Sequence, residues 1–234
     1  MKPKRKDKIK WSSNIAYAVG LLTTDGNLSN SRRHIDFTSK DIQLIKTFKK
    51  CLGIKNKIGL KTSGFSNKKY PRIQFSDVTL YNWLLGIGLT PKKSKTIGKL
   101  KIPDKYFFDF LRGHFDGDGC CYSYWDKRWD SSFMFYMKFL SASEEHILWL
   151  RYKIKNLINI KGDLTQSSRD HVYQLKYAKR ESKILISKMY YKKNLPCLER
   201  KYRKLKTILE IDNKEANRLP ELNGRVLELA DSLD

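Results

Sequence analysis

Two Asp-Gly pairs, Asp25-Gly26 and Asp118-Gly119, end two similar apolar stretches of this 234-residue sequence. The stretches read IAYAVGLLTTDG from residue 15 and FFDFLRGHFDGDG from residue 107, and their matched positions are 93 residues apart. A constant spacing between matched residues indicates an internal repeat. Each acid follows a predicted helix, whose C-terminal end already carries partial negative charge and disfavours an isolated carboxylate. The pattern therefore predicts that the two halves bring Asp25 and Asp118 together to hold a cation.

Paired carboxylates of this kind suit the hydrolysis of phosphodiester bonds. That reaction needs an activated water and relief of charge on the leaving oxygen, and a hard divalent cation supplies both. Mg²⁺ needs only one or two protein carboxylates when substrate phosphates and water complete its shell. Asp-Gly is also a common turn, which is the simpler interpretation of either pair alone. The matched pair favours catalysis by Asp25 and Asp118, whereas Asp116, whose counterpart is Thr23, is expected either to be structural or to support the catalytic acids without contacting the metal.

The two stretches resemble the paired motifs of the LAGLIDADG homing endonucleases in their single-chain, two-repeat form. Both motifs are matched, and the repeat layout extends the resemblance over about residues 14 to 206. The first motif has Thr23 where the consensus has its first Asp, and the second has Arg112, His114 and Gly117 at less constrained positions. The position that supplies the catalytic carboxylate is acidic in both halves, and a glycine follows it each time.

The resemblance implies an α+β fold of two pseudo-symmetric αββαββα repeats. Antiparallel sheets would form a DNA-binding saddle, and the motif helices would pack at the repeat interface. The segments expected are a basic leader at 1–13, repeat 1 at 14–98, a linker at 99–104, repeat 2 at 105–206 and an acidic C-terminal tail at 207–234. Matched mid-helix glycines, Gly20 and Gly113, predict close contact of the two motif helices, since glycine otherwise costs a helix about 1 kcal/mol.

Local patterns predict the same order of elements twice. In the first half they are helix 14–25, strands 27–30 and 33–38, helix 41–52, strands 56–62 and 70–76, and helix 77–85. In the second half they are helix 105–117, strands 120–126 and 132–140, helix 143–158, strands 162–167 and 171–177, and helix 180–191. Basic loops are expected at 90–95 and 195–204. Expected helix caps are Asn14, Asp77, and a capping box of Ser141 with Glu144.

The net charge of +24 indicates a polyanionic partner, with nucleic acid favoured over an anionic membrane or a merely soluble basic surface. Residues 207–234 have a net charge of −4, so the basic surface belongs to the first 206 residues, including the leader MKPKRKDKIK, which is expected to lie against phosphate. The hydrophobic and aromatic content fits a globular protein rather than a disordered one. No apolar run suits a signal peptide or a membrane span. Four cysteines without CxxC spacing predict neither zinc nor disulfides, hence an intracellular location, with cytoplasm, nucleoid and organelle not distinguished.

Basic residues near the carboxylates should stabilise the transition state. The resemblance places a lysine in the loop after each repeat, which points to Lys92 or Lys93 and to Arg200 or Lys201. Phosphate clamping alone is the alternative role for these side chains. Ser39 and Ser141 occupy matching places and would either position water or cap a helix. The resemblance assigns catalysis to Asp25, Asp118, Lys93 and Lys201, and metal binding to Asp25, Asp118, Gly26 and Gly119.

Base readout is expected from the outward side chains of the strands, because arginine and glutamine suit guanine and adenine edges. An outward strand face is polar in any soluble sheet, which is the alternative explanation. The candidates in repeat 1 are Asn27, Ser29, Arg33, Asp36, Lys61, Arg72 and Gln74, and those in repeat 2 are Tyr122, Tyr124, Lys138, Gln174 and Lys176.

The resemblance implies an intron-encoded, monomeric, site-specific homing endonuclease that cuts double-stranded DNA. It would bind a long asymmetric target in the major groove, hydrolyse phosphodiester bonds and leave short 3′ overhangs. The expected cofactor is Mg²⁺, with Mn²⁺ able to substitute and Ca²⁺ supporting binding without cleavage. One alternative is an RNA maturase that binds host intron RNA and assists splicing on the same fold, and another is a transcriptional regulator. Both acids favour the nuclease, because neither alternative needs them.

Overall fold

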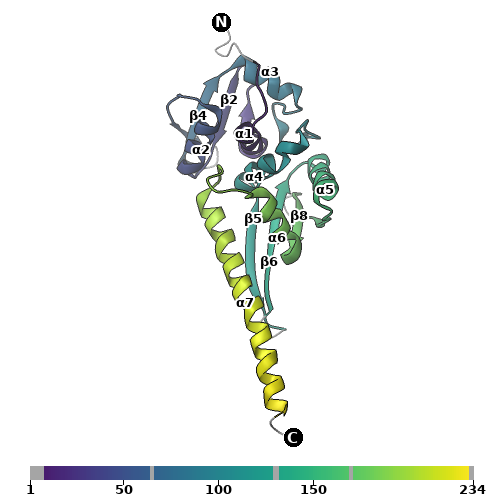
Figure 1. Cartoon of the computed structure of the whole chain (residues 1–234). Helices are drawn as coiled ribbons and strands as arrows, with labels where there is room; N and C mark the ends of the chain where they lie inside the picture. The colour runs from purple at the N-terminus through teal and green to yellow at the C-terminus, as the bar shows by residue number, and fades with distance from the viewer. Residues whose placement is uncertain (1–7, 64–65, 129–131, 169–170, 232–234) are drawn as a thin grey trace.

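The computed structural model describes residues 8–63, 66–128, 132–168 and 171–231, and for residues 63, 66 and 218–231 only the course of the backbone. The described chain forms two halves with the same order of elements (Figure 1). The first half comprises α1 (Ser13–Thr24), β1 (Gly26–Leu28), β2 (His34–Thr38), α2 (Ile42–Leu52), β3 (Gly59–Ser63), β4 (Ser66–Ser76) and α3 (Val78–Gly86). The 3-10 turns η1 (Lys93–Lys95) and η2 (Asp104–Tyr106) connect it to the second half.

The second half repeats the order and adds one helix. It comprises α4 (Phe107–Gly117), β5 (Cys120–Asp126), β6 (Ser132–Ser141), α5 (Glu144–Ile158), β7 (Asp163–Gln166), β8 (Tyr173–Ala178) and α6 (Lys179–Met189), followed by α7 (Glu199–Asp231). The predicted α+β class and αββαββα repeats are therefore confirmed. Most of the basic leader, residues 1–7, lies outside the described residues.

Helices α1 and α4 pack against each other at the centre of the molecule. A Cβ atom on Gly20 would collide with the Phe110 carbonyl oxygen, and one on Gly113 would collide with the Tyr17 carbonyl oxygen. Neither helix could approach the other this closely with a larger residue, because backbone would meet side chain. The predicted contact at these two glycines is confirmed, and it brings the C-terminal ends of both helices to one place.

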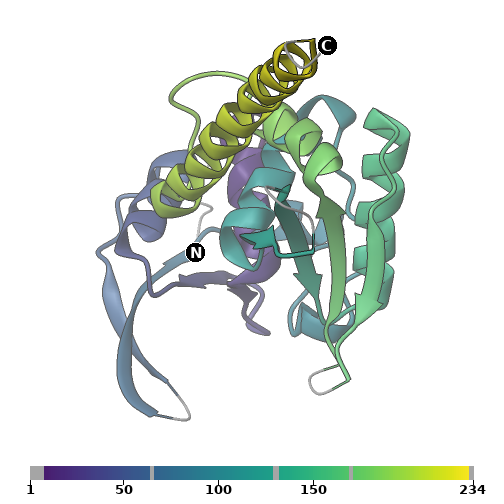
Figure 2. The same ribbon diagram turned by 90° about the horizontal axis from the view of Figure 1, so that it is seen from below.

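Each half contains one four-stranded antiparallel sheet, with strand orders β1-β2-β4-β3 and β5-β6-β8-β7. Side chains alternate between a core face and an open face, as strand geometry requires. In β2, Ile35 and Phe37 are buried while His34 and Thr38 are partly exposed. In β6, every second residue from Phe133 to Phe139 is buried. The two sheets lie on either side of the motif helices, and their outer hairpins project toward the same side in Figure 2.

The cores beneath the two sheets are largely aromatic. Phe37 of β2 packs against Phe48 of α2, with ring centroids 4.6 Å apart. Phe139 of β6 lies 5.9 Å from Phe115 of the motif helix α4 and 6.2 Å from Tyr177 of β8. The motif helix α4 is therefore packed against both α1 and the second sheet, which limits movement of its C-terminal end.

Several predicted boundaries differ from the structure. Ser12, not Asn14, caps α1 by accepting from the N–H of Ile15, because the helix begins one residue earlier than expected. The capping box at Ser141 and Glu144 is wrong, since Ser143 caps α5 by accepting from the N–H of His146. The expected cap Asp77 is confirmed by its bond to the N–H of Leu80 at 2.9 Å.

The last helix, α7, overturns the prediction of a basic loop through residue 204. It begins at Glu199 and continues without interruption across residues 206 and 207. Leu205 and Ile208 are buried, and Asp212 accepts from Lys183 at 2.8 Å and pairs with Lys179. In Figure 2, α7 lies on the opposite side of the motif helices from the tips of the outer hairpins.

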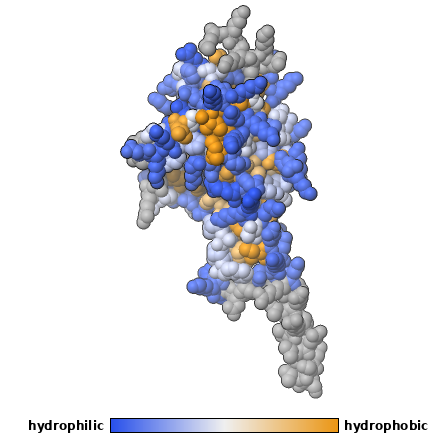
Figure 3. Space-filling view, turned by 90° about the vertical axis from the view of Figure 1, so that its left-hand side faces the viewer, coloured by the Kyte–Doolittle hydropathy of each residue, from blue (hydrophilic) through white to orange (hydrophobic). Residues whose placement is uncertain are grey.

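The surface is mostly hydrophilic. Hydrophilic side chains cover most of the face in Figure 3, and apolar side chains form only smaller patches there. No helix in the described ranges is long and apolar enough to pass through a bilayer.

Candidate active site at the ends of the motif helices

Asp25 and Asp118 follow the last residues of α1 and α4. Their backbone N–H groups close the helices by donating to Leu21 O at 3.1 Å and His114 O at 3.2 Å, respectively. Both side chains are exposed and line one cavity of about 390 Å³, which is also bordered by the β2–α2 connection and α7. The fold thus brings one acid from each repeat to a common, solvent-open cavity.

The charge of Asp118 acts on Asp25. Desolvation by the packed helix ends and the nearby Asp118 together raise the pKa of Asp25 to about 6, against the opposing effect of Lys201 and Lys93. Desolvation also raises the pKa of Asp118, while Lys201 and Lys93 lower it. Within the described residues, neither carboxylate accepts a hydrogen bond from a side chain or backbone donor. A positive ligand between these oxygens would relieve their repulsion.

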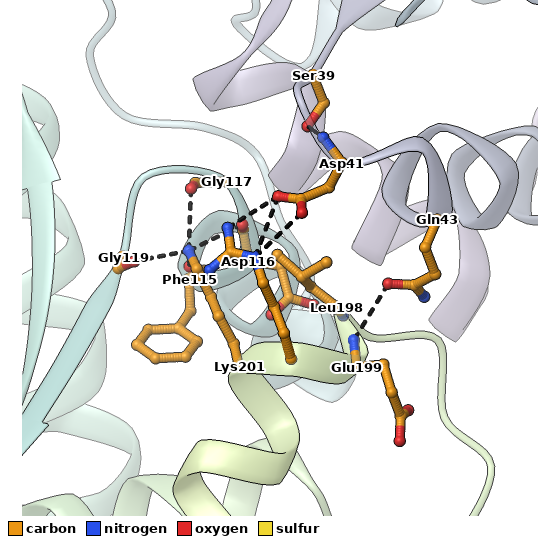
Figure 4. Close-up of polar contacts among 11 residues, drawn as sticks. Ser39, Asp41, Gln43, Phe115, Asp116, Gly117, Gly119, Leu198, Glu199 and Lys201 are labelled. Carbon is orange, nitrogen blue, oxygen red and sulfur yellow. Dashed lines mark hydrogen bonds and ion pairs between the residues drawn. The ribbon is translucent and has the colours of Figure 1, made fainter.

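Lys201 reaches the end of α4 from α7. Its ammonium donates to the carbonyl oxygens of Phe115 at 2.7 Å, Asp116 at 2.9 Å, Gly117 at 3.0 Å and Gly119 at 2.6 Å (Figure 4). A cation at a helix C-terminus satisfies carbonyls that have no partner within the helix. Burial lowers the pKa of Lys201, opposed by the charge of Asp116.

Lys93 occupies the matching place at the end of α1. Its ammonium donates to Thr24 O at 3.4 Å and to Gly26 O, the counterparts of two of the Lys201 acceptors. Burial lowers its pKa to about 8, although Asp118 and Asp25 favour the charged form. The structure therefore brings Asp25, Asp118, Lys93 and Lys201 together, and each lysine also has a helix-capping role that the sequence did not indicate.

Gly26 and Gly119 have a packing role in this geometry. A Cβ atom on Gly26 would collide with Leu22, and one on Gly119 would collide with Phe115, each in the preceding helix. The carbonyl oxygens of both glycines accept from the lysines. The carboxylates of Asp25 and Asp118, by contrast, accept no hydrogen bond from any described residue.

Asp116 links the two halves through hydrogen bonds. Its Oδ2 accepts from the hydroxyl of Tyr17 on α1 at 2.8 Å and from the N–H of Leu198 at 2.7 Å. Burial raises its pKa to about 6, while these donors lower it. The structural role expected for Asp116 is confirmed, and Tyr17 is a partner that sequence reasoning missed.

A buried arginine holds the segment that leads to Lys201. Arg112 of α4 donates to Pro196 O at 2.9 Å, to Met189 O at 2.5 Å and to Asp109 Oδ1 at 2.7 Å. The carbonyl acceptors lie at the end of α6 and in the connection to α7, so Arg112 fixes this connection onto the motif helix. Charge-assisted bonds of this kind are about twice as strong as neutral ones.

Arg200, the alternative to Lys201, contacts Asp41 instead of the helix end. Its Nε lies 3.1 and 3.2 Å from the two Asp41 oxygens, and its Nη2 lies 2.8 Å from Oδ2. Ser39 accepts from the N–H of Asp41 at 3.2 Å, and Ser141 accepts from the N–H of Ser143 at 3.0 Å. Both serines therefore stabilise the turn before a helix, which supports the capping alternative for them.

The open face of the first sheet carries most of the polar residues expected there. Asn27 lies opposite Asp36, which lies opposite Gln74. Arg72 shares this face and donates to Asp36 at 2.7 Å. Lys61 is exposed on β3. Arg72 is thus held in place, while Lys61 extends toward solvent.

Two expected readout residues are not on this face. Arg33 is exposed, but it precedes β2, which begins at His34. Ser29 follows β1, where its hydroxyl accepts from the N–H of His34 at 3.2 Å and contacts Ser31 at 2.7 Å. The hydroxyl of Ser29 is used by the turn, and the prediction of both residues as outward strand positions is wrong.

The open face of the second sheet is an aromatic ladder with lysines. The Tyr136 ring stacks 5.2 Å from Tyr122 and 6.2 Å from Tyr124. Lys138 lies over the Tyr122 ring at 5.0 Å, and Lys176 lies over the Tyr136 ring at 5.1 Å. Lys138 also donates to Gln174 at 3.2 Å. Sequence reasoning missed Tyr136, although its two-residue spacing from Lys138 on one strand was the available signal.

Metal-binding capacity at the site rests on two carboxylates. Among the described residues, no group of three or more His, Cys, Asp or Glu side chains could hold a metal ion. All four cysteines lie among the described residues and are free thiols. A cation here would need further oxygen ligands from water or substrate.

Comparison with known proteins finds similar structures but no similar sequence. No protein-family model and no curated protein matches the sequence. The structure is similar to the meganuclease I-SmaMI bound to uncleavable DNA, with TM-score 0.57 and 16% identity over 91% of this chain and 98% of that one. It is similar to an I-DmoI variant in complex with its target DNA in the presence of Mn, with TM-score 0.50 and 16% identity over 79% and 96% of the two chains.

A third similar structure is full-length DUF199/WhiA from Thermatoga maritima. The TM-score is 0.55 and the identity 15%, covering 96% of this chain and 71% of that one. Identities this low establish a shared fold, the two-repeat LAGLIDADG fold, in agreement with the fold that the motifs imply.

Proposed function

We propose that this chain is a metal-dependent, site-specific endonuclease that hydrolyses phosphodiester bonds of double-stranded DNA. The observation that carries the proposal is the placement of Asp25 and Asp118, one from each repeat, in a single solvent-open cavity at the ends of packed helices. Structural carboxylates would be expected to accept hydrogen bonds, as Asp116 does, whereas these two accept none from the described residues. Unpartnered acids in a cleft beside lysines are typical of a catalytic site.

The two carboxylates fit a hard divalent cation such as Mg²⁺ or Mn²⁺. Both supply oxygen donors, both are accessible, and the raised pKa of Asp25 reflects desolvation and repulsion that a cation would offset. Bound there with substrate phosphate and water, the metal would activate a water and relieve charge on the leaving oxygen. Asp25 and Asp118 are the residues we assign to hold it, and the carbonyls of Gly26 and Gly119 already serve the lysines.

The surrounding residues of the chain would bind and orient the phosphates. Lys93 and Lys201 keep positive charge beside the acids, which favours ionised carboxylates at neutral pH and attracts the DNA backbone. Their ammoniums are fixed by helix carbonyls, so they supply a stationary positive field rather than mobile side chains. A preorganised field costs little reorganisation when charge develops on the scissile phosphate.

The two open sheet faces are the proposed DNA-binding surface. A major groove admits a two-stranded β-ribbon, and the faces carry amide, hydroxyl and cationic groups suited to base edges and phosphates. In this proposal the residues that contact DNA are Asn27, Lys61, Arg72, Gln74, Tyr122, Tyr124, Lys138, Gln174 and Lys176, and the buried Asp36 holds Arg72 in place. Two unlike faces favour a monomer acting on a long asymmetric target, and intron homing with short 3′ overhangs follows from the motif resemblance.

DNA binding without cleavage is the second candidate. The similarity to DUF199/WhiA covers 96% of this chain, so the fold alone favours this function as much as the nuclease. Binding alone leaves the two unpartnered acids without a role, because acids placed beside phosphates weaken attraction to DNA. The RNA maturase is disfavoured for the same reason, because RNA binding would also leave the two acids without a role. We therefore place the nuclease first.

The decisive experiment compares binding with cutting on the same DNA. The purified full chain is incubated with a supercoiled plasmid that carries the uninterrupted allele of its host locus, in Mg²⁺, Mn²⁺, Ca²⁺ or EDTA. We expect nicked and linear products in Mg²⁺ and Mn²⁺, a gel shift without cutting in Ca²⁺, and no cutting in EDTA. Asp25→Asn and Asp118→Asn should each lower linearisation by about 100-fold or more while the gel shift persists, since the cation loses a ligand.

Asp104→Asn is the matched control for these variants. Asp104 is exposed, pairs with Lys153 and precedes the opposite end of α4, so its replacement should leave both binding and cutting unchanged. Wild-type protein that shifts the plasmid without nicking it in any metal would favour the binding function. Cutting in EDTA at the rate seen in Mg²⁺ would exclude the metal mechanism.

A further inference from the structure

Asp41 departs from the usual behaviour of an aspartate at the start of a helix. It is the N-cap residue of α2, yet its carboxylate makes no bond to the helix N–H groups. An N-cap side chain that bonds its own helix stabilises that helix, and this aspartate does not supply that stabilisation. All of its side-chain hydrogen bonds to described residues go to Arg200 of α7, on the other half of the molecule.

The second repeat has a different arrangement at the matching place. Ser143 is the N-cap of α5, accepts from the N–H of His146 and donates to Ile97 O. Lys92, which precedes Lys93 as Arg200 precedes Lys201, is exposed, and its ammonium makes no ion pair with any described residue. Asp41 and Arg200 therefore form a fixed pair across the two halves, whereas the matching positions are Ser143 and Lys92, which form no such pair among the described residues.

The Asp41–Arg200 pair borders the cavity that contains Asp25 and Asp118. The carboxylate binds Nε and Nη2 of the guanidinium, which fixes its plane and leaves Nη1 without a partner among the described residues. The pair is half-exposed on the arginine side, with 53% of that side chain accessible. An arginine held in this way can donate to a phosphate oxygen without first losing side-chain freedom.

We propose that Asp41 is a positioning residue that holds Arg200 ready to donate to one scissile phosphate, so that the two DNA strands are cut at unequal rates. This inference rests on the proposed endonuclease function. The strand whose phosphate meets Arg200 is cut first, because its donor is preorganised. The other strand depends on Lys92, which must be ordered when DNA binds. The protein therefore passes through a nicked intermediate with a defined broken strand.

The test measures the cutting rate of each DNA strand separately. A duplex of the uninterrupted host-locus sequence, with a different fluorophore on each strand, is cut under single-turnover conditions by wild type, Asp41→Asn, Arg200→Ala and the double variant. Asp41→Asn should slow one strand by about 10-fold and leave the other within about twofold, because only positioning is lost. Arg200→Ala should slow the same strand by about 100-fold. The double variant should be no slower than Arg200→Ala, since Asp41 acts through Arg200.

Arg203→Ala is the control. Arg203 is an exposed residue of α7 that pairs with Glu199, and its replacement removes the same positive charge as Arg200→Ala. It should leave the ratio of the two strand rates unchanged. Thermal unfolding of each variant shows whether the fold is retained. Equal slowing of both strands by Asp41→Asn, an unchanged strand ratio, or additive effects in the double variant would each overturn the inference. A wild-type protein that nicks neither strand would instead remove the endonuclease function itself, and the inference with it.

Discussion

The ammonium nitrogen of Lys201 lies 2.6 Å from the carbonyl oxygen of Gly119, the residue directly after Asp118. Three more carbonyls at the end of α4 accept from the same ammonium, whereas Lys93 donates to two carbonyls at the end of α1. The two lysines are therefore matched in position and unequal in the number of acceptors they satisfy.

Replacing each lysine by methionine should destabilise the fold unequally. Lys201→Met leaves four carbonyls without this donor and should lower the free energy of unfolding by about 2 to 4 kcal/mol, and Lys93→Met by about half as much. Urea unfolding followed by circular dichroism measures both. If Lys201→Met unfolded at the same urea concentration as wild type, its contacts would contribute nothing to stability, and only its charge near Asp118 would matter.

Substitution at the motif-helix interface should be costly. Gly20→Ala places a methyl group against the backbone of α4 at Phe110 and should lower the free energy of unfolding by about 3 kcal/mol. Gly86→Ala is the matched control, because a Cβ there meets no atom within 4 Å and the residue ends α3. It should change stability by no more than about 1 kcal/mol. Equal melting temperatures for the two variants would show that α1 and α4 are not packed this closely.

A buried histidine pair should contribute a loss of stability on mild acidification. His114 and His146 stack with ring centroids 5.4 Å apart, and burial lowers the pKa of His146 to about 4 and that of His114 well below its usual range. Lys93 and, for His114, Lys201 are positive groups that also disfavour protonation. Below pH 6.5 the unfolded chain binds protons at these positions that the folded chain does not.

Protonation of His146 should lower the free energy of unfolding by about 3 kcal/mol between pH 6.5 and pH 4, whereas Asp25 and Asp116, whose pKa is raised to about 6 in the fold, contribute in the opposite direction. Urea unfolding at several pH values measures the net slope. His114→Phe keeps an aromatic ring between Phe110 and Phe139, and as the pH falls it should lose less stability than wild type over this range. A slope identical to that of wild type would show that His114 does not contribute to the acid sensitivity.

The sequence was sufficient to predict the features that depend on short-range residue patterns. The 93-residue spacing, the Gly20 and Gly113 contact and the alternation of Ile35 and Phe37 all follow from helix and strand geometry. Placement of Lys93 and Lys201 near the acids came from the motif resemblance rather than from spacing. Arg33 was misplaced because strand boundaries depend on pairing partners, and β2 pairs only from His34.

What the sequence could not indicate depends on contacts between distant segments. Asp41 and Arg200 are 159 positions apart, and no local pattern distinguishes this aspartate from an ordinary helix cap. Tyr17 and Asp116 meet only because two glycines let their helices touch. The many charged residues before position 204 favour a loop prediction. They leave few apolar positions to show the helical period, in which Leu205 and Ile208 are buried.

The last prediction separates the packed part of α7 from its acidic end. Residues Leu205, Ile208 and Asp212 are buried, and Asp212 pairs with Lys179 and Lys183 of α6. A chain ending at residue 217 retains these contacts and Lys201, so it should keep its melting temperature within a few degrees and bind DNA at least as well as the full chain. The segment removed contains four acids and two bases, so its loss makes the protein more basic.

A chain ending at residue 204 tests whether the packed part of α7 is needed for stability and cutting. It keeps Lys201 but loses Leu205, Ile208 and the ion pairs of Asp212, and burial of two such apolar side chains is worth about 3 to 6 kcal/mol. This chain should unfold at a much lower temperature and lose cutting with it, because Lys201 and Arg200 would no longer be held at the cavity. Thermal unfolding and the plasmid assay, run on both truncations, measure the difference. If the chain ending at 217 lost DNA binding while its melting temperature stayed unchanged, residues 218–234 would contribute to the DNA contact, and the assignment of that contact to the two sheet faces would be wrong.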